Sequence, residues 1–414
     1  MTFEGWNWLP WALIAALIFF GLGWFVARID LRELLSESRA LPQSYFKGLN
    51  FLLNEQQDKA IEAFLVVTQA NTETVELQFA LGSLFRRRGE IERAIRLHQS
   101  LSERGDLSAD QRIQAQLGLA QDYQKAGLLD RAEQILADIA RLAKGGGVSP
   151  PAHTQALQLL LDVYIQERNW PKAIAAATQL ETVGKRAYRK EIAHFFCEQA
   201  IDEYDQGQQS AAQALLDQAL ATNPHCVRAN MIRGEWLALV GEHRQAIAAW
   251  REIETQDSAY LGLSADAMLA SYQALGQESE GLQELSALQR QYPTLDFLNA
   301  IFQTTLKNEG ADAAYNLVRD DLKRNPTLVG IDRLLDARIS GSTVDRIEDL
   351  QLVKSVVHAH ASRLAVYLCS HCGFKARQFY WHCPACGGWE TFPPRRTAEY
   401  DTADRHLARL HIEG

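Results

Sequence analysis

Small and bulky apolar residues recur at regular intervals between polar ones from about residue 45 to residue 330. The recurring order is a small residue, an aromatic, a turn glycine, an alanine, a bulky apolar residue and then a helix stop. A period near 34 residues predicts a stack of antiparallel helix pairs rather than a plain helical bundle. One position of the pattern aligns in eight copies, with spacings of 34, 38, 41, 39, 34, 35 and 33 residues: Ala60, Ala94, Ala132, Ala173, Ala212, Ala246, Gly281 and Ala314.

The copies resemble the tetratricopeptide repeat. Gly82, Phe85, Gly89 and Ala94 fit one copy, and Pro224 ends the second helix of another. In such a pair, small side chains let the helices cross closely, glycine permits the turn and proline stops the second helix. The resemblance implies a solenoid with a concave groove that holds a peptide or a partner helix. The fourth and eighth copies match the pattern least well.

An uncharged apolar stretch precedes the repeats. The chain carries no charge between Glu4 and Arg28, and residues 6–26 are long enough to cross the roughly 30 Å hydrocarbon core of a bilayer as one helix. Tryptophans lie toward both ends of the stretch, as in interfacial belts. A cleaved signal peptide is the alternative, but no basic segment precedes the stretch and no small-residue cleavage site follows it. We therefore predict a retained, single-pass membrane anchor.

The flanks of this stretch differ in charge. No Lys or Arg precedes it, whereas Arg28, Arg32 and Arg39 follow it. The positive-inside rule then predicts that the N-terminus lies outside the cytoplasm and that the bulk of the chain is cytoplasmic. Gly21 and Gly23 offer a close-packing face for a homodimer, although two glycines alone do not establish one.

The charge balance weighs against nucleic-acid binding. The chain has 42 Lys and Arg against 51 Asp and Glu, a net charge of −9, and so lacks the basic surface that nucleic acids require. The sequence also contains no phosphate-binding loop, dinucleotide fingerprint or hydrolase motif. We interpret the many carboxylates as solvated helix faces, and predict no catalytic residues and no enzymatic activity.

Four of the six cysteines give the strongest chemical signal. They form two C-x-x-C elements separated by ten residues, each followed by glycine: Cys369, Cys372, Cys383 and Cys386. Two such elements can place four thiolates around one metal ion. They resemble the knuckles of rubredoxins and zinc ribbons, although the spacer is shorter than usual. The resemblance implies a reduced rubredoxin-like module of about 30 residues, whose folding needs the metal.

Zinc and iron both suit four thiolates. We favour zinc because the sequence shows no site for a redox partner. Thiolate ligands need a reducing compartment, which agrees with the cytoplasmic placement. Aromatic residues crowd around the cysteines, and our hypothesis is that the module packs into the solenoid groove. Cys197 and Cys226 stand alone and are interpreted as core thiols.

A run of three arginines is a second candidate site. Arg86, Arg87 and Arg88 end a predicted helix, and we expect at least one of them to face the groove and pair with an acidic partner segment. The alternative is a solvated helix end, whose cations interact favourably with the helix dipole.

The sequence as a whole predicts an all-α fold, a tetratricopeptide-repeat solenoid with an N-terminal transmembrane helix and a small C-terminal rubredoxin-like metal knuckle domain. The predicted segments are an anchor at 1–27, a juxtamembrane segment at 28–44, an array of about eight repeats at 45–330, a connecting helical segment at 331–366, the metal-binding domain at 367–394 and a charged tail at 395–414.

This order of parts resembles the lipopolysaccharide assembly protein B family over the whole chain. The resemblance implies an adaptor in the inner membrane of Gram-negative bacteria, with a periplasmic N-terminus, that works with other lipopolysaccharide-assembly proteins. It further implies that the adaptor binds the membrane protease FtsH and promotes degradation of the deacetylase LpxC, which regulates lipopolysaccharide synthesis. The alternatives are a membrane-tethered electron carrier with iron, and a general envelope-assembly scaffold unrelated to proteolysis.

Overall fold

The computed structural model describes parts of 47–63 together with residues 75–184, 186–341, 347–364 and 366–396. The predicted anchor, the juxtamembrane segment and most of the charged tail lie outside these residues. Among the described residues, no helix is both long enough and apolar enough to cross a membrane. The chain divides into two compact parts, an N-terminal part at Met1–Val163 and a C-terminal part at Tyr164–Gly414.

The N-terminal part consists mainly of successive helices. They are α4 (Val75–Arg88), α5 (Ile91–Glu103), α6 (Ala109–Lys125), α7 (Leu129–Lys144) and most of α8 (Pro150–Gln166). The packing of each helix on the next runs from α4 to α7. A capping box starts α6, because the Ser108 side chain accepts a hydrogen bond from the Gln111 N–H and the Gln111 side chain accepts one from the Ser108 N–H.

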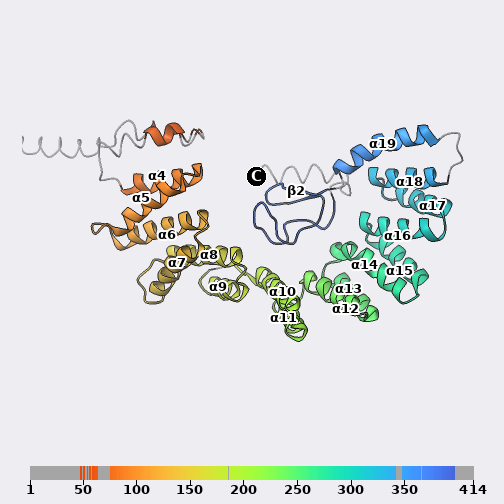
Figure 1. The fold of residues 1–414 in the computed structure, drawn as a ribbon, viewed down its shortest axis with the longest axis horizontal. Helices are drawn as coiled ribbons and strands as arrows, with labels where there is room; N and C mark the ends of the chain where they lie inside the picture. The colour runs from red at the N-terminus through yellow and green to blue at the C-terminus, as the bar shows by residue number, and fades with distance from the viewer. Residues whose placement is uncertain are drawn as a thin grey trace, which may run out of the picture. The chain divides into compact units, whose positions relative to one another are not determined.

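The C-terminal part continues the same arrangement, and Figure 1 shows its helices following one another as stacked pairs. They are α9 (Trp170–Val183), α10 (Arg189–Asp205), α11 (Gln209–Thr222), α12 (Val227–Leu239), α13 (His243–Asp257), the 3₁₀ helix η1 (Ser258–Ser264), α14 (Ala265–Ala274), α15 (Glu278–Gln291), α16 (Leu295–Asn308), α17 (Ala311–Leu322), α18 (Leu328–Ser340) and α19 (Ile347–Leu364). A mostly helical, tetratricopeptide-like solenoid is therefore confirmed for the described residues.

The aligned alanine position explains the repeat period. From Ala94 to Ala314, each aligned residue is the fourth residue of the second helix in its pair, and each is buried. The first helix of a pair is equally constrained. At Gly234 a Cβ atom would lie 2.3 Å from Nε1 of Trp250, which is fully buried. Only small residues at such positions let the two helices pack this closely.

The turns between paired helices explain the two poorest copies. In most pairs a glycine with positive φ lies five residues before the aligned position, as Gly89 does before Ala94. In the fourth copy Arg168 occupies this place, with φ 55°. In the eighth copy Gly310 lies only four residues before Ala314 and is itself the N-cap of α17. The fourth copy thus keeps the positive-φ turn with a non-glycine residue, whereas the eighth copy places its positive-φ glycine one residue later.

A small domain without helices follows α19. Its strands β1 (Tyr367–Leu368) and β2 (Lys375–Ala376) are antiparallel, with Tyr367 opposite Ala376 and Leu368 opposite Lys375. A second pairing joins His382 to Trp389. Two short pairings cannot form a separate core of useful size, so the domain depends on its four cysteines and on the surface beneath it.

Candidate metal centre and its docking surface

The structure brings the four predicted cysteines together. Their sulfur atoms all lie within 4.8 Å of one another, and among the described residues they form the one group with potential metal ligands in this arrangement. The Sγ atoms of Cys369 and Cys386 are 3.8 Å apart, as are those of Cys372 and Cys383. A regular tetrahedron with zinc–sulfur bonds of about 2.3 Å has edges of about 3.8 Å, so the four thiols fit one metal ion.

The two C-x-x-C elements have matching backbone hydrogen bonds. The N–H of Gly373 donates to the carbonyl of Cys369, and that of Gly387 donates to the carbonyl of Cys383. Both glycines have positive φ, 74° and 70°, which lets the backbone turn sharply after each second cysteine. Burial raises the pKa of Cys369, but hydrogen bonding with Thr391 and with the backbone outweighs it and lowers the pKa to about 6. This thiolate is therefore available to a metal at neutral pH.

Aromatic rings attach the metal-binding domain to the C-terminal part of the solenoid. Trp381 stacks on Tyr260 of η1, with ring centroids 5.3 Å apart and an interplanar angle of 9°. Trp389 stacks on His194 of α10 at 4.9 Å and meets Phe195 edge to face. The domain thus packs against α10 and η1, on the side of these helices where Figure 1 shows β2. These contacts agree with our hypothesis as far as packing on the C-terminal part of the solenoid is concerned.

Polar contacts fix the position of the domain further. The Glu390 carboxylate lies 2.8 Å from Nε2 of His194 and 2.7 Å from Nζ of Lys190. At the far edge, Arg396 donates to Asp296 of α16 at 2.6 Å. Glu390 has a positive φ of 50°, a conformation that costs a non-glycine residue about 1–3 kcal/mol and persists only where surrounding contacts impose it.

Burial sets the charge state of the His194–Glu390 pair. It lowers the pKa of His194, which is almost fully buried, despite the opposite effect of Glu390. Burial raises the pKa of Glu390, but hydrogen bonds from His194 and Lys190 outweigh it and the net pKa is lowered. At neutral pH we therefore describe a neutral imidazole that donates from Nε2 to a carboxylate. Nδ1 of His194 is buried without a hydrogen-bond partner among the described residues.

The three candidate arginines have different surroundings in the N-terminal part. Arg86 donates to Asp122 of α6 at 2.6 Å and to the Gly118 carbonyl at 3.2 Å, and Asp122 also accepts a 2.5 Å bond from His98 of α5. Asp122 and His98 are buried. Arg88 pairs with Asp58 and Glu90, whereas Arg87 is exposed. Sequence reasoning missed this buried network, because its members come from three helices.

The two remaining cysteines are buried, as expected, but they do not stand alone. Cys197 in α10 and Cys226 at the N-cap of α12 are both fully buried, and their Sγ atoms are 3.8 Å apart. They belong to the core that joins the helices beneath the metal-binding domain.

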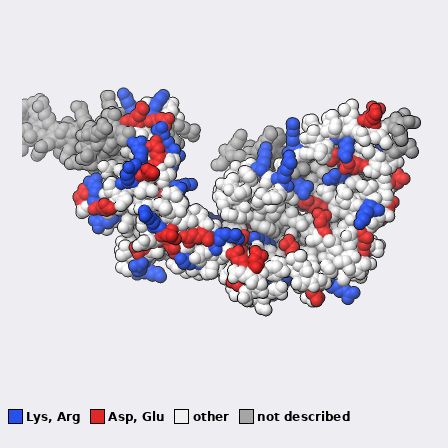
Figure 2. Space-filling view, in the orientation of Figure 1, with Lys and Arg blue, Asp and Glu red and all other residues white. Residues whose placement is uncertain are grey.

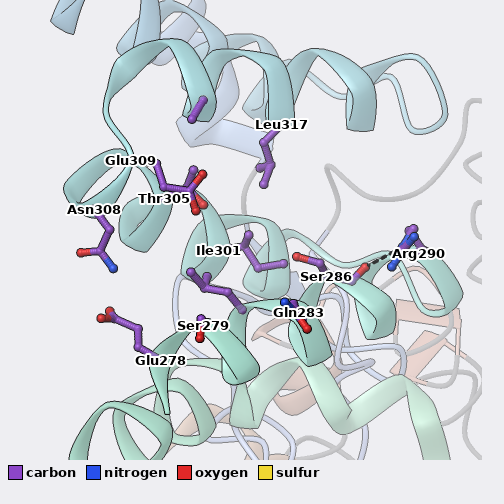
Figure 3. Close-up of a pocket in the computed structure, with 12 residues that line it drawn as sticks. Glu278, Ser279, Gln283, Ser286, Arg290, Ile301, Thr305, Asn308, Glu309 and Leu317 are labelled. Atoms are coloured by element: carbon purple, nitrogen blue, oxygen red, sulfur yellow. Dashed lines mark hydrogen bonds between the residues drawn. The ribbon is translucent and has the colours of Figure 1, made fainter. Parts of the chain in front are cut away.

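A groove of about 880 Å³ lies away from the metal centre, between α15, α16 and α17. Figure 3 shows Ile301 and Leu317 directed into it, with Glu278 and Asn308 at one end and Arg290 at the other. None of the predicted site residues lines it. Its mixed polar and apolar lining does not identify a ligand.

Known sequence families match two regions of the chain, and curated relatives match most of its length. A sequence family described as the rubredoxin metal binding domain matches residues 367–394, and the tetratricopeptide repeat family matches residues 197–260. Lipopolysaccharide assembly protein B of Escherichia coli is 32% identical over 376 residues, which cover 90% of this chain and 95% of that protein. The protein of the same name from Haemophilus influenzae is 27% identical over 393 residues, covering 92% and 96%.

Solved structures of tetratricopeptide repeat proteins match this chain only at low TM-scores. A tetratricopeptide repeat protein from Parabacteroides merdae covers 76% of this chain and 100% of its own, with a TM-score of 0.32 and 15% identity. Family match and sulfur geometry together support a four-cysteine site for one metal ion.

The arginine run gives a first prediction. Arg86→Ala leaves the buried Asp122 carboxylate without its guanidinium partner, so we expect it to lower the stability of the N-terminal part by about 3 kcal/mol. Arg87→Ala removes an exposed side chain and should change stability by less than about 0.5 kcal/mol. Hydrogen exchange of peptides from α4 to α6 measures the stability of this part in both variants. Equal protection in the two would show that the buried network does not stabilise this part.

The His194 environment gives a second prediction. Because the folded state depresses the pKa of His194, the unfolded chain binds the proton more readily, and stability is lost as pH falls below about 6.5. His194→Gln removes this contribution, which amounts to at most about 1.4 kcal/mol per pH unit. The thermal unfolding temperature should decrease less steeply between pH 7.5 and pH 5.5 in this variant than in the parent chain. His360→Gln, at an exposed position, is the control and should follow the parent.

Proposed function

This chain belongs to the lipopolysaccharide assembly protein B family, and we propose that it acts as a non-enzymatic adaptor that regulates lipopolysaccharide synthesis. In this proposal it holds the deacetylase LpxC for the membrane protease FtsH and so promotes the degradation of LpxC. The observation that carries the proposal is the fixed docking of the metal-binding domain on a repeat solenoid, through Trp381, Trp389 and Glu390. The C-terminal part of the solenoid and the domain together then offer a preformed surface to protein partners.

Rigid docking suits an adaptor for a physical reason. A partner that binds a preformed surface loses less conformational freedom than one that must first order the surface. The stacked rings and the Glu390 ion pair hold the domain on α10 and η1 before any partner arrives. The exposed Arg87 in the N-terminal part is our candidate contact for an acidic partner segment, with Arg88 and Arg86 holding the adjacent surface.

Membrane anchoring forms part of the proposal. Residues 6–26 cross the bacterial inner membrane once, with the N-terminus in the periplasm and the rest of the chain in the cytoplasm. The anchor confines the adaptor to the plane in which a membrane protease acts, which raises their effective concentration for each other. Gly21 and Gly23 would supply the contact if two chains associate through this helix. Other lipopolysaccharide-assembly proteins are further candidate partners at the membrane.

We further propose that Cys369, Cys372, Cys383 and Cys386 hold one zinc ion. Zinc in such a site supplies folding free energy and no redox chemistry. A structural role agrees with the aromatic residues near the cysteines, which pack against the solenoid. An electron carrier would instead hold iron at the same four sulfurs.

The metal proposal predicts the effect of losing one ligand. Cys383→Ser should abolish stoichiometric metal binding and lower the thermal stability of the C-terminal part, because the domain loses the ion that folds it. Elemental analysis of the purified chain should find one zinc and a colourless protein. Cys226→Ser, the same change at a buried thiol outside the site, should keep the metal. A coloured, iron-containing protein would favour the electron carrier.

The adaptor proposal predicts a change in LpxC turnover. After new protein synthesis is blocked, the half-life of LpxC in cells should be clearly longer without this chain, and Cys383→Ser should lengthen it similarly. Deleting residues 1–27 tests the need for anchoring. The half-life of an unrelated cytoplasmic protein is the control. If LpxC is degraded equally fast with and without the chain, the adaptor proposal is wrong, and a scaffold unrelated to proteolysis becomes the better interpretation of the function.

A further inference from the structure

A cavity of about 430 Å³ lies where the metal-binding domain meets the last helices of the solenoid. Its walls come from α16, α18 and α19 on one side, and from Arg377 and Arg396 of the C-terminal segment on the other. Figure 2 shows basic side chains gathered on the C-terminal part beside the end of the described chain. The cavity therefore combines residues of two elements that only docking brings together. Neither the metal centre nor the proposed adaptor role accounts for it.

The lining is rich in cations although the whole chain is acidic. Arg333, Arg377 and Arg396 line the cavity together with His358, against one carboxylate, Asp332. Two of these guanidinium groups are held by acceptors beyond the lining carboxylate: Arg333 donates to Asn299 and Asp336, and Arg396 donates to Asp296.

Arg377 differs from the other two arginines. Its side chain is exposed, and among the described residues it has no ion-pair partner. A guanidinium group has five N–H donors in a planar fork, which matches phosphate oxygens. Arg377 thus brings an uncompensated charge to a cavity whose other arginines are already oriented.

Asp332 sets a second requirement on the ligand. Its side chain is 3% exposed, and Oδ2 lies 3.0 Å from Nδ1 of His358. Oδ1 is buried without a hydrogen-bond partner among the described residues. A buried acceptor left unpaired costs about 1–3 kcal/mol, which a ligand with a hydrogen-bond donor would recover. A bare anion would not satisfy it.

We propose that this cavity binds a phosphate monoester that carries a hydroxyl or amino group close to the phosphate. The phosphate accepts hydrogen bonds from the three arginines, and the neighbouring hydroxyl or amino group donates one to Oδ1 of Asp332. The volume lies within the range of small-molecule sites, so a ligand the size of a sugar phosphate or a glycerophosphate fits. Because the ligand contacts both α18 and the metal-binding domain, its binding strengthens their docking.

Isothermal titration of the full chain in detergent tests the proposal with glycerol 3-phosphate as the probe. Arg377→Gln should weaken binding about tenfold or more, since it removes a charge-assisted pair. Arg319→Gln, an exposed arginine of α17 outside the cavity, should bind as the parent does. Methyl phosphate, which carries no hydroxyl group on carbon, should bind more weakly than glycerol 3-phosphate. Thermal unfolding confirms that both variants are folded.

Three results would overturn the proposal: no binding of glycerol 3-phosphate at 10 mM or below (roughly the weakest affinity that such a contact set allows), equal binding by Arg377→Gln and the parent, or equal binding of methyl phosphate. A short-chain lysophosphatidic acid, the same headgroup with an acyl chain, separates the two sources of the ligand. Tighter binding of the acylated form indicates a lipid headgroup, and equal binding indicates a soluble ester. LpxC turnover is a separate readout, so failure here leaves the adaptor proposal standing.

Discussion

The contact between Glu390 and His194 links the metal-binding domain to the solenoid, and most features of the C-terminal part depend on it. A carboxylate, a neutral imidazole and a lysine meet where Trp389 stacks on the same imidazole. The strained backbone at Glu390 would relax without these partners. The domain has two short strand pairings and a metal site, too little to hold a defined position by itself. Its orientation is therefore a property of the interface.

The repeat architecture could be predicted from the sequence because its constraint is local and recurs. A second helix that must pass close to the first needs a small residue at its fourth position, and this need recurs at Ala94, Ala132 and the later copies. The four metal-ligand cysteines could also be predicted from the sequence, because their spacing and the glycine after each pair suit the binding of one ion. Even the poorly matching fourth copy keeps the turn, because Arg168 adopts the positive φ that glycine has in most other copies.

The contacts that the sequence concealed join residues far apart in the chain. His194 and Glu390 are 196 positions apart, and the sequence around either residue does not indicate that the other is its partner. The same holds for Cys197 and Cys226, whose Sγ atoms lie 3.8 Å apart although the two residues are 29 positions apart in the chain. Arg86 belongs to a run of three arginines whose sequence suggests an exposed helix end. Its partner Asp122 nevertheless lies on the first helix of the next pair. Register between repeats decides such contacts, and a repeat period alone does not specify it.

In the C-terminal part, metal binding, docking of the metal-binding domain and ligand binding in the cavity are thermodynamically coupled. The four cysteines hold the knuckles, the knuckles present Trp389 and Glu390 to α10, and docking brings Arg377 and Arg396 to face Asp332. Any ligand that contacts both sides of this interface favours the docked state by the same factor by which docking favours the ligand. A partner bound across solenoid and domain is subject to the same linkage. The metal site can thus govern a binding surface without touching the ligand, because it determines whether that surface exists.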